Sequence, residues 1–554
     1  MIDSITMELT RSSLYYASEE MGIALRNSSY SPNIKERMDH SAAVFDTEAR
    51  LIAQAEHIPV HLGSLPWGLS NTLSYCQKEG IDLEEGSMIV VNNPYIAGTH
   101  LNDVTVIRPI YHSGKLIAFS ANKAHHSDIG GKVPGSISSD ARSLYEEGLI
   151  VNPTFLMKNN EFVYETLSFF RSNTRTPRER IGDLRAQAAA NFTGEKRVIQ
   201  LADRYGLQSF KDSVNESFNY TQRIVGNRIS ALKEGEYKAE DFLESPDEKL
   251  LKMAASLKIK GGKIFIDYAG TVKQVPYPLN AVFGVTLSGV QFVLRSLLGE
   301  DIPVNNGTFR DVEVSAPVGT LLNPEYPAPV SGGNVETSQR NADLVFKLFL
   351  NVYPDLVPAA AGGSMNNIMM GGKTSKGQWA FYETIGVGLG GRKGMDGIDA
   401  IHSNMTNTMN TPVEDVELSM PILVRRYEFR QDSSGSGEFR GGSGIVRSFE
   451  ILSETTFTVV AERGKLAPWG LYGGMDGSKT RVTLKRNGKN SKVAVKSSTQ
   501  LLPGDIITIE TAGGGGYGDP RSRSKNKVLE DIENEIITRK KAVKDYGLVE
   551  KKKL

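Results

Sequence analysis

Residues 98–128 read GTHLNDVTVIRPIYHSGKLIAFSANKAHHSD and contain two apolar runs separated by a turn. The runs 104–110 and 115–121 are rich in Val, Ile and Phe, which predicts two β-strands. The tripeptide His112-Ser113-Gly114 predicts the hairpin turn between them. Polar residues gather at the outer ends of both strands, where loops converge and binding sites are commonly built.

Histidines and carboxylates at these strand ends predict a metal site. His100 and Asp103 are three residues apart, so a tight turn brings both side chains to one side. His125 and His126 come from the neighbouring strand end and point to opposite faces, so one is expected as a ligand and the other as a residue that orients it or contacts substrate. Two imidazoles and a carboxylate suit a divalent transition metal with open coordination positions. The alternative is a hydrogen-bonded turn with a core histidine.

The composition excludes several classes of protein. The 554 residues exceed one compact core, so roughly two to four domains are expected. Lys plus Arg and Asp plus Glu both number 64, which gives no electrostatic drive toward nucleic acid or an anionic membrane. The single cysteine, Cys76, excludes an internal disulfide and a Cys-based zinc site. No apolar run could span a bilayer and no signal-peptide pattern is present, so a cytoplasmic location is expected.

The periodicity along the chain predicts an α+β protein of several domains. Residues 4–26 have apolar positions at helical spacing after a candidate N-cap, and residues 176–232 are mostly helical in pattern. Short strands alternate with glycine-rich turns from residue 378 onward, and 525–546 predicts a final helix. We therefore expect an N-terminal α/β metal-binding half, a helical middle, a glycine-rich β C-terminal half and a C-terminal helix with a tail. The expected regions are 1–205, 206–360, 361–520 and 521–554.

Several catalytic motifs are missing from the sequence. It contains neither a Gly-x-x-x-x-Gly-Lys-Ser/Thr phosphate loop nor a Gly-x-Ser-x-Gly nucleophile elbow. The glycine-rich stretches 388–392 and 513–516 do not follow the strand–glycine–helix order of a dinucleotide site. They are expected to form turns and subunit interface.

Polar and glycine-rich blocks follow one another along almost the whole chain. They are residues 34–41, 58–64, 92–104, 125–131, 173–177, 331–340, 407–414, 437–442 and 513–520. In sequence and order these blocks resemble the hydantoinase B / 5-oxoprolinase family. That family contains the second subunits of ATP-dependent N-methylhydantoinase and of prokaryotic-type 5-oxoprolinase, and it is related to subunits of acetone and acetophenone carboxylase.

The resemblance implies a ligand set. In the carboxylase branch the metal is held by a His-x-x-Asp and a later His, positions that are matched here by His100, Asp103 and His125. An acidic residue near the N-terminus completes that site, and Asp39 is the matching position. The expected ion is divalent: Zn, Mn, Fe or Co.

The resemblance also implies a partner and a reaction. The companion hydantoinase A-type subunit binds ATP and Mg²⁺, and a heterotetramer or a larger assembly is expected. ATP cleavage in that subunit would activate a lactam or an imide, and the metal centre of this chain would support hydrolysis of the ring. Two alternatives stay open. One is a subunit of an ATP-dependent ketone carboxylase, and the other is a non-catalytic scaffold with a structural metal.

Further residues are expected near the reacting atoms. His126 and Asp128 are expected to transfer protons. A turn with free backbone N–H groups can hold an anion or a carbonyl oxygen. On that basis Ser331, Gly332, Gly333 and Asn334 are expected on the substrate side. His61, in the block 58–64, is expected there as well, with a packed core histidine as the alternative.

Overall fold

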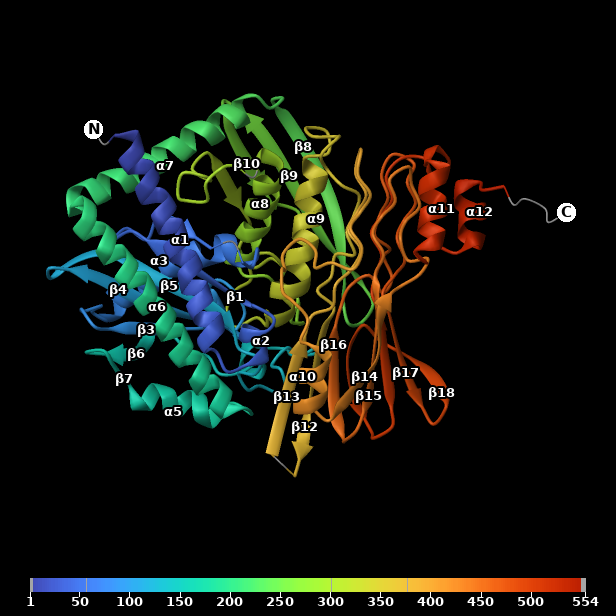
Figure 1. Ribbon diagram of the computed structural model, residues 1–554, viewed down its shortest axis with the longest axis horizontal. Helices are drawn as coiled ribbons and strands as arrows, with labels where there is room; N and C mark the ends of the chain where they lie inside the picture. Colours follow the sequence, from blue (N-terminus) through green and yellow to red (C-terminus); the bar gives the residue numbers. More distant parts are fainter. Residues whose placement is uncertain (1–2, 56, 300, 376, 550–554) are drawn as a thin grey trace. The chain divides into compact units, whose positions relative to one another are not determined.

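The structure is a computed structural model that describes residues 3–549 except 56, 300 and 376 (Figure 1). The chain forms two compact units. The first extends to Ser136 and adds Ala141–Lys238 and Ala254–Asn334, and the second consists of Ile137–Asp140, Ala239–Met253 and the described residues from Val335 onward. Helices and sheets occur in both units, which confirms the α+β class.

The four predicted regions differ from these two units. Two short segments, Ile137–Asp140 and Ala239–Met253, are counted with the second unit although they lie between segments of the first in the sequence. Composition along the sequence cannot predict these interruptions, because it does not show which segments pack together. The last five residues of the predicted C-terminal tail, 550–554, lie outside the described residues.

An antiparallel sheet in the order β2-β1-β5-β4-β3-β6-β7 is the base of the first unit. Its strands are β1 (His40–Phe45), β2 (Leu51–Gln54), β3 (Met88–Val91), β4 (Asp103–His112), β5 (Lys115–His125), β6 (Thr154–Lys158) and β7 (Glu161–Phe162). The predicted hairpin is confirmed as β4–β5. Ser113 and Gly114 form its turn with φ values of 51° and 72°, the left-handed geometry that a tight two-residue hairpin turn requires.

Helices cover both faces of this sheet, with α1 and α6 on one face and α3 on the other. The helices of the first unit are α1 (Ser4–Ser28), α2 (Pro32–Lys35), α3 (His61–Glu79), α4 (Pro94–Ala97), η1 (Leu144–Glu146), α5 (Tyr164–Asn173), α6 (Pro177–Tyr205), α7 (Leu207–Ser230) and α8 (Phe283–Leu298). The helix predicted from the first residues begins at the Asp3 cap, whose side chain accepts a hydrogen bond from Thr6 N. The predicted helical stretch 176–232 is two helices, because Gly206, at φ 79°, separates α6 from α7.

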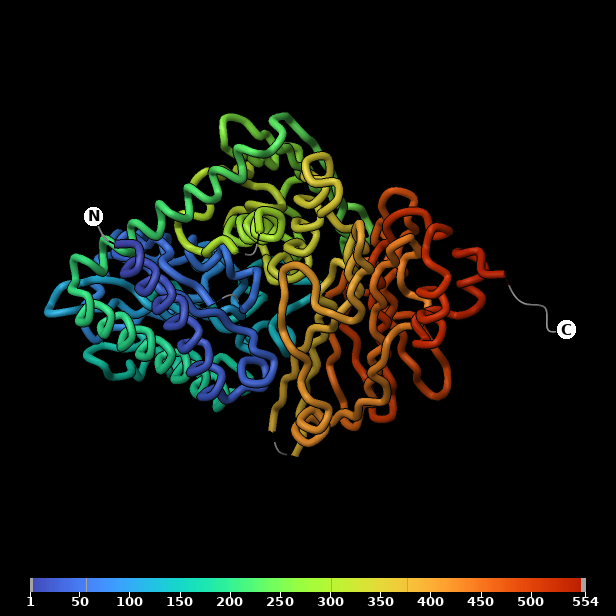
Figure 2. Tube along the Cα trace, turned by 45° about the horizontal axis from the view of Figure 1, so that its top comes forward, coloured from blue at the N-terminus to red at the C-terminus, as the bar shows by residue number. Residues whose placement is uncertain are grey.

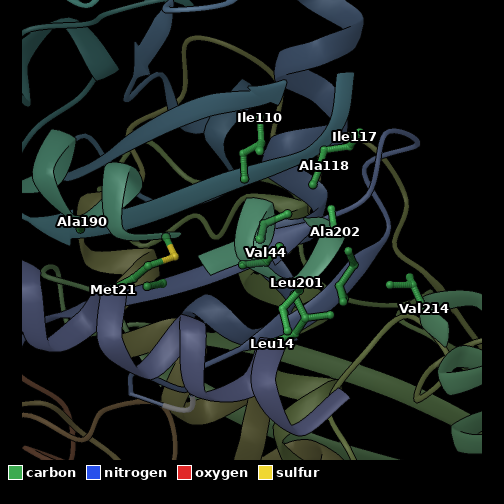
Figure 3. Packing of buried hydrophobic residues seen from close by; sticks show 14 of the residues in the cluster. Leu14, Met21, Val44, Ile110, Ile117, Ala118, Ala190, Leu201, Ala202 and Val214 are labelled. Atoms are coloured by element: carbon green, nitrogen blue, oxygen red, sulfur yellow. The ribbon is translucent and has the colours of Figure 1, made fainter. Parts of the chain in front are cut away.

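Alternate residues of the sheet supply two separate cores. Ala42 and Val44 of β1 join Leu14 and Met21 of α1 in the cluster under α1, α6 and α7 (Figure 3). Ala43 and Phe45 point the other way and pack with α3. Because side chains alternate between the two faces of a strand, each residue of β1 contributes to one of these two clusters. Figure 2 shows α1, in blue, running beside α6, in teal.

A smaller sheet completes the first unit, in the order β11-β10-β9-β8. Its strands are β8 (Gly235–Glu244), β9 (Leu250–Lys260), β10 (Lys263–Asp267) and β11 (Val312–Ser315). Residues 239–253, at the turn end of β8 and β9, are counted with the second unit. Helix α8 packs against α3, and Ser288 Oγ accepts hydrogen bonds from Gly63 N and Ser64 N. These contacts satisfy first-turn N–H groups of α3, which have no partner within the helix.

Two sheets that share one hydrophobic core form most of the second unit. One has the order β13-β12-β16-β19 and the other β14-β15-β20-β17-β18. The strands are β12 (Asn367–Thr374), β13 (Gly377–Glu383), β14 (Ile422–Phe429), β15 (Ile445–Ile451), β16 (Thr455–Val460), β17 (Arg481–Arg486), β18 (Lys489–Val493), β19 (Lys496–Leu501) and β20 (Ile506–Glu510). The helices are α9 (Ser338–Leu348), α10 (Val413–Ser419), η3 (Pro520–Ser522), α11 (Lys525–Glu533) and α12 (Arg539–Tyr546), and a π-helical turn, η2 (Gly333–Thr337), precedes α9.

Glycines in the second unit allow backbone segments to touch. A Cβ on Gly514 would lie 1.8 Å from the carbonyl oxygen of Leu389, and a Cβ on Gly442 would lie 1.9 Å from that of Ile398. The glycine-rich stretches therefore do more than form turns, since they pack main chain against main chain.

The predicted final helix 525–546 is wrong as one element, because α11 and α12 are separate helices. Glu535, at φ 57°, breaks the chain direction between them, and Ile536 N bonds back to the carbonyl of Asp531. Among the described helices, none combines the length and apolar character needed to cross a membrane.

A network of buried charges lies inside the second unit. Glu462 accepts hydrogen bonds from Lys496 Nζ at 2.7 Å and from Arg340 at 3.3 Å. Glu336, also fully buried, accepts from Met365 N at 3.1 Å and from Asn367 Nδ2 at 2.8 Å. Burial, reinforced by the nearby Glu462 carboxylate, raises the pKa of Glu336 to about 8. Glu336 is therefore protonated in the folded protein at neutral pH.

Replacing Met21 with Ala should destabilise the first unit. Met21 is fully buried, and α6 approaches so closely that a Cβ on Gly194 would lie 2.5 Å from its sulfur atom. We expect a loss of about 2–5 kcal/mol, because the packing leaves little room to collapse into the cavity. Ile23→Ala, on the same helix but 56% exposed, should change stability by only about 0.5 kcal/mol. Urea unfolding of both variants measures the difference, and equal losses would contradict this packing.

Glu336→Gln should make the protein less sensitive to alkaline pH. The raised pKa means that the folded state holds a proton that the unfolded state releases between pH 4.5 and about 8. The contribution of Glu336 to stability is therefore full below pH 4.5 and is lost as pH rises toward 8. Glutamine mimics the protonated form, so its stability relative to wild type should increase across this window. Unfolding free energies at several pH values test this, with the exposed Glu533→Gln as control. Parallel curves for Glu336→Gln and wild type would refute it.

Candidate metal centre

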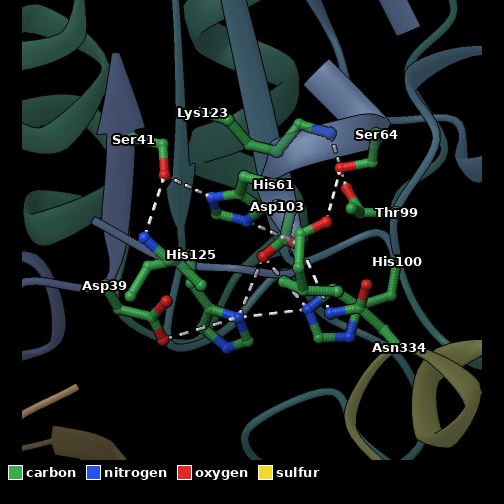
Figure 4. Close-up of polar contacts among 12 residues, drawn as sticks. Asp39, Ser41, His61, Ser64, Thr99, His100, Asp103, Lys123, His125 and Asn334 are labelled. Carbon is green, nitrogen blue, oxygen red and sulfur yellow. Dashed lines mark hydrogen bonds and ion pairs between the residues drawn. The ribbon is translucent and has the colours of Figure 1, made fainter. Parts of the chain in front are cut away.

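Two histidines and an aspartate meet at one end of the β4–β5 hairpin. Asp103, the first residue of β4, lies opposite His125, the last residue of β5, in the antiparallel register. His100 stands in the turn between α4 and β4. Asp103 Oδ1 is 3.1 Å from both His100 Nε2 and His125 Nδ1, and these two nitrogens are 3.1 Å apart (Figure 4). All three residues are at most 2% exposed.

The hydrogen bonding of His100 shows that this group suits a cation. His100 Nδ1 lies 3.3 Å from the carbonyl oxygen of Ser331, to which it can only donate. In a neutral ring, Nε2 then presents a lone pair to Asp103 Oδ1, which is also an acceptor. Two acceptors 3.1 Å apart need a proton or a metal ion between them. With His125 beside them, these residues form a group that can hold a metal ion.

Charge and burial act against each other in this group. Burial disfavours an imidazolium at His100, but the Asp103 carboxylate, together with Asp39 and the Ser331 carbonyl, outweighs burial and raises the pKa of His100. Burial also disfavours the Asp103 carboxylate, yet its contacts with His100, His125 and His61 hold the pKa of Asp103 well below its ordinary value. Burial is the main cause that lowers the pKa of His125, which favours the neutral ring that a metal requires.

Asp39 lies at the edge of the group. The residue immediately precedes β1, and its carbonyl oxygen accepts a hydrogen bond from His125 N at 3.0 Å. Its carboxylate oxygen Oδ2 is 4.0 Å from His125 Nδ1. The structure therefore brings the fourth expected ligand to the same side as the other three, although farther from them than they are from one another.

His61 contacts the other oxygen of Asp103. Its Nε2 lies 3.4 Å from Asp103 Oδ2, and its Nδ1 lies 2.9 Å from Ser41 Oγ. His61 is the first residue of α3, the helix whose first turn Ser288 caps. This histidine was expected on the substrate side, whereas the structure places it directly behind a candidate ligand.

The turn of residues 331–334 reaches the same group. Besides the Ser331 carbonyl, Asn334 Nδ2 lies 3.4 Å from Asp103 Oδ2. A Cβ on Gly332 would be 2.7 Å from the carbonyl oxygen of Pro278, and one on Gly333 would be 1.8 Å from that of Asn280. These glycines are therefore required by close backbone packing.

His126 and Asp128 are not brought to the group. His126 points to the opposite face of the sheet, where its Nε2 lies 3.0 Å from Gln187 Oε1 of α6, and burial lowers the pKa of His126 to about 4. Asp128 accepts hydrogen bonds from Gly130 N, Gly135 N and Arg175. Their predicted role in proton transfer stays a prediction without support from these contacts.

Lys123 was not among the residues expected from the sequence. It precedes His125 by two residues on β5 and so shares its face of the sheet. Fully buried, it donates from Nζ to the carbonyl of Ala97 at 2.8 Å and to Thr99 Oγ1 at 2.9 Å. Burial lowers the pKa of Lys123 to about 7. The two-residue period of a strand was the signal that could have identified it.

Comparison with known proteins agrees with the resemblance seen in the sequence. The family model described as hydantoinase B/oxoprolinase matches residues 3–520. The B-type subunit of a putative D-/L-hydantoinase from Pseudomonas sp. (strain NS671) is 32% identical over 99% of this chain and 95% of its own length. The 5-oxoprolinase of Dictyostelium discoideum is 33% identical over 94% of this chain, which spans only 41% of that protein.

Solved structures share the fold along the whole chain. The ATP-dependent caprolactamase from Pseudomonas jessenii matches 100% of this chain and 97% of its own, with a TM-score of 0.93 and 30% identity. A nucleotide-free acetone carboxylase matches 99% of this chain and 80% of its own with a TM-score of 0.92, but at 17% identity this likeness shows the fold alone. On the family match over residues 3–520, together with these full-length relatives, the chain belongs to the hydantoinase B/oxoprolinase family.

Proposed function

We propose that this chain is the B-type subunit of an ATP-dependent cyclic-amide hydrolase, in which His100, Asp103 and His125 hold a divalent metal ion. The observation that carries the proposal is the buried triangle of two ring nitrogens and a carboxylate oxygen at mutual distances of 3.1 Å. One full-length relative is named as the B-type subunit of a hydantoinase, which supports a separate partner subunit. We take that partner to be an A-type subunit that binds ATP.

The similarity to caprolactamase supports an amide as the substrate. That enzyme is 30% identical over the whole chain and is named as an ATP-dependent lactam-cleaving protein. An unstrained amide is a poor electrophile, which explains the need for activation by ATP. At such a site a divalent ion supplies Lewis-acid polarisation of a carbonyl or a water oxygen.

The residues of this chain would act by binding and orientation. Oδ1 of Asp103 faces the two histidine nitrogens, whereas Oδ2 is occupied by His61 and Asn334. The carboxylate is thus held in one orientation by contacts with both of its oxygens. A ligand whose orientation is fixed by such contacts keeps the geometry of the site preorganised before substrate binds.

The main alternative is a subunit of a ketone carboxylase, which would use the same ligands. The acetone carboxylase shares this fold, but a likeness at 17% identity is no evidence of a shared function. A structural metal in a non-catalytic scaffold is the other alternative. We favour the hydrolase because the caprolactamase, the hydantoinase subunit and the Dictyostelium 5-oxoprolinase are each 30% identical or more.

Removing a candidate ligand should abolish metal binding. His100→Ala and His125→Ala each remove one of the two candidate nitrogen ligands. We expect metal affinity to fall by more than about 100-fold, which exceeds the loss that follows when a residue that only hydrogen-bonds a ligand is removed. His126→Ala, on the opposite face of the sheet, should retain the metal. Metal content after dialysis, measured by atomic emission, checks this. His112→Ala, at the far end of β4, is the control for general damage. Unchanged metal in His100→Ala would place the ion elsewhere.

The chain together with its ATP-binding partner should open a cyclic amide. The substrates to test are 5-oxoproline, hydantoin, N-methylhydantoin and caprolactam, with bicarbonate plus acetone or acetophenone in parallel. We expect ADP release matched by amide hydrolysis, and we expect a chelator to stop the hydrolysis. Product that incorporates bicarbonate, with all four amides inert, would assign the chain to the carboxylase branch instead.

A further inference from the structure

Glu147 is a buried carboxylate that no step above uses. It follows η1 in the first unit and is 1% exposed. Burial raises the pKa of Glu147 to about 7, although hydrogen bonds from Ser331 and Val330 counteract it. Keeping a carboxylate away from water is unfavourable unless its hydrogen bonds compensate. The contacts of Glu147 therefore show what it is placed to do.

Among the residues that the structure describes, the donors to the Glu147 carboxylate come from one short segment. Val330 N donates at 3.0 Å, Ser331 N at 2.9 Å and Ser331 Oγ at 2.8 Å, all to Oε1, and Val330 N also lies 3.1 Å from Oε2. One side chain thus fixes two successive peptide groups. A carboxylate that accepts several hydrogen bonds in this way holds its donors in a single arrangement.

Neighbouring groups hold the rest of the segment. Tyr95 Oη donates to the carbonyl of Ala328 at 2.8 Å, and Asn280 Nδ2 donates to that of Pro329 at 2.9 Å. Gly333 N donates to the carbonyl of Pro278 at 2.8 Å. Between these points Glu147 supplies the acceptors for Val330 and Ser331, so that the carbonyl of Ser331 has a defined position.

That carbonyl is the group that faces His100 Nδ1. A hydrogen bond at one ring nitrogen decides which nitrogen carries the proton and which presents a lone pair. With Nδ1 donating to Ser331, His100 turns the lone pair of Nε2 toward Asp103 and His125. The segment also carries Asn334, which contacts Asp103 Oδ2.

We propose that Glu147 is a positioning residue of the metal centre, which fixes the orientation and the proton position of His100 through Ser331: it holds the N–H and hydroxyl of Ser331, and the carbonyl of the same residue faces His100. The proposal rests on the metal-holding role of His100 proposed above. Glu147 touches neither the metal nor the substrate. Its effect is on how well His100 is presented as a ligand.

Cobalt binding by the chain tests this without any turnover. In Glu147→Gln the amide oxygen can take the place of Oε1, but an N–H₂ group takes the place of Oε2, which lies 3.1 Å from Val330 N. Two donors then face each other, which should displace Val330 and, with it, the adjoining Ser331. We expect the Kd for Co²⁺ to rise by about 10–100-fold, with a changed visible absorption spectrum of the bound Co²⁺. The unfolding midpoint of the metal-free protein is measured beside it.

Asp46→Asn is the matched control. Asp46 is also a buried carboxylate that accepts hydrogen bonds from two backbone N–H groups, those of Glu48 and Arg50. It lies at the opposite end of β1 from Asp39, about 20 Å away at the rise of a strand. Its Co²⁺ affinity and spectrum should equal those of wild type even if its unfolding midpoint falls.

The outcomes separate the two proposals. Wild-type affinity and spectrum in Glu147→Gln, whatever its unfolding midpoint, would overturn the positioning role and leave the metal centre intact. Failure of the wild-type chain to bind Co²⁺ would overturn the metal centre and, with it, this inference. If Glu147→Gln does not fold, Ser331→Ala decides, because it removes one hydrogen bond to Glu147 and keeps the carbonyl. It should weaken Co²⁺ binding by about fivefold, and no change would overturn the proposal.

Discussion

The register of β4 against β5 is the constraint on which the candidate centre depends. It places Asp103 opposite His125, and the pairing of His40 with Ala124 then brings Asp39 alongside. Because strand side chains alternate, a slip of one residue would turn His125 away and present His126 in its place. The two-residue turn pairs His112 with Lys115, and an irregularity in the ladder between Ile110 and Tyr111 then shifts the pairing by one residue. This shift produces the register in which Asp103 lies opposite His125.

The two faces of this sheet carry different sets of polar side chains. On the face toward α3 lie Asp103, Lys123 and His125. On the face toward α6, polar side chains connect helix to strand: Gln187 Nε2 donates to the carbonyl of Val104 at 2.8 Å. Asn191 Nδ2 does the same to that of Val106 at 3.0 Å, so α6 is tied along β4. His126 belongs to this second set through its contact with Gln187, and the adjacent histidines therefore serve different faces.

The sequence was sufficient for features that depend on local spacing. The hairpin, the pair His100 and Asp103, and the division of His125 and His126 between two faces follow from turn chemistry and from the periods of helix and strand. The contact between His61 and Asp103 could not be predicted from local spacing, because it depends on how α3 packs against α8 through Ser288. The break at Glu535 and the assignment of two interrupted segments to the second unit depend in the same way on tertiary packing.

Glu147 had no signal in the sequence because the segment that it holds lies far along the chain. That segment offers His100 a peptide oxygen, which every amino acid possesses, in place of a side-chain acceptor. A point substitution at Ser331 can therefore change the local chemistry without deleting the acceptor. Because the acceptor is a main-chain oxygen, no single substitution in this segment deletes it. A substitution there acts on His100 by shifting that oxygen, so it weakens the centre by degrees and does not remove the partner of the histidine outright.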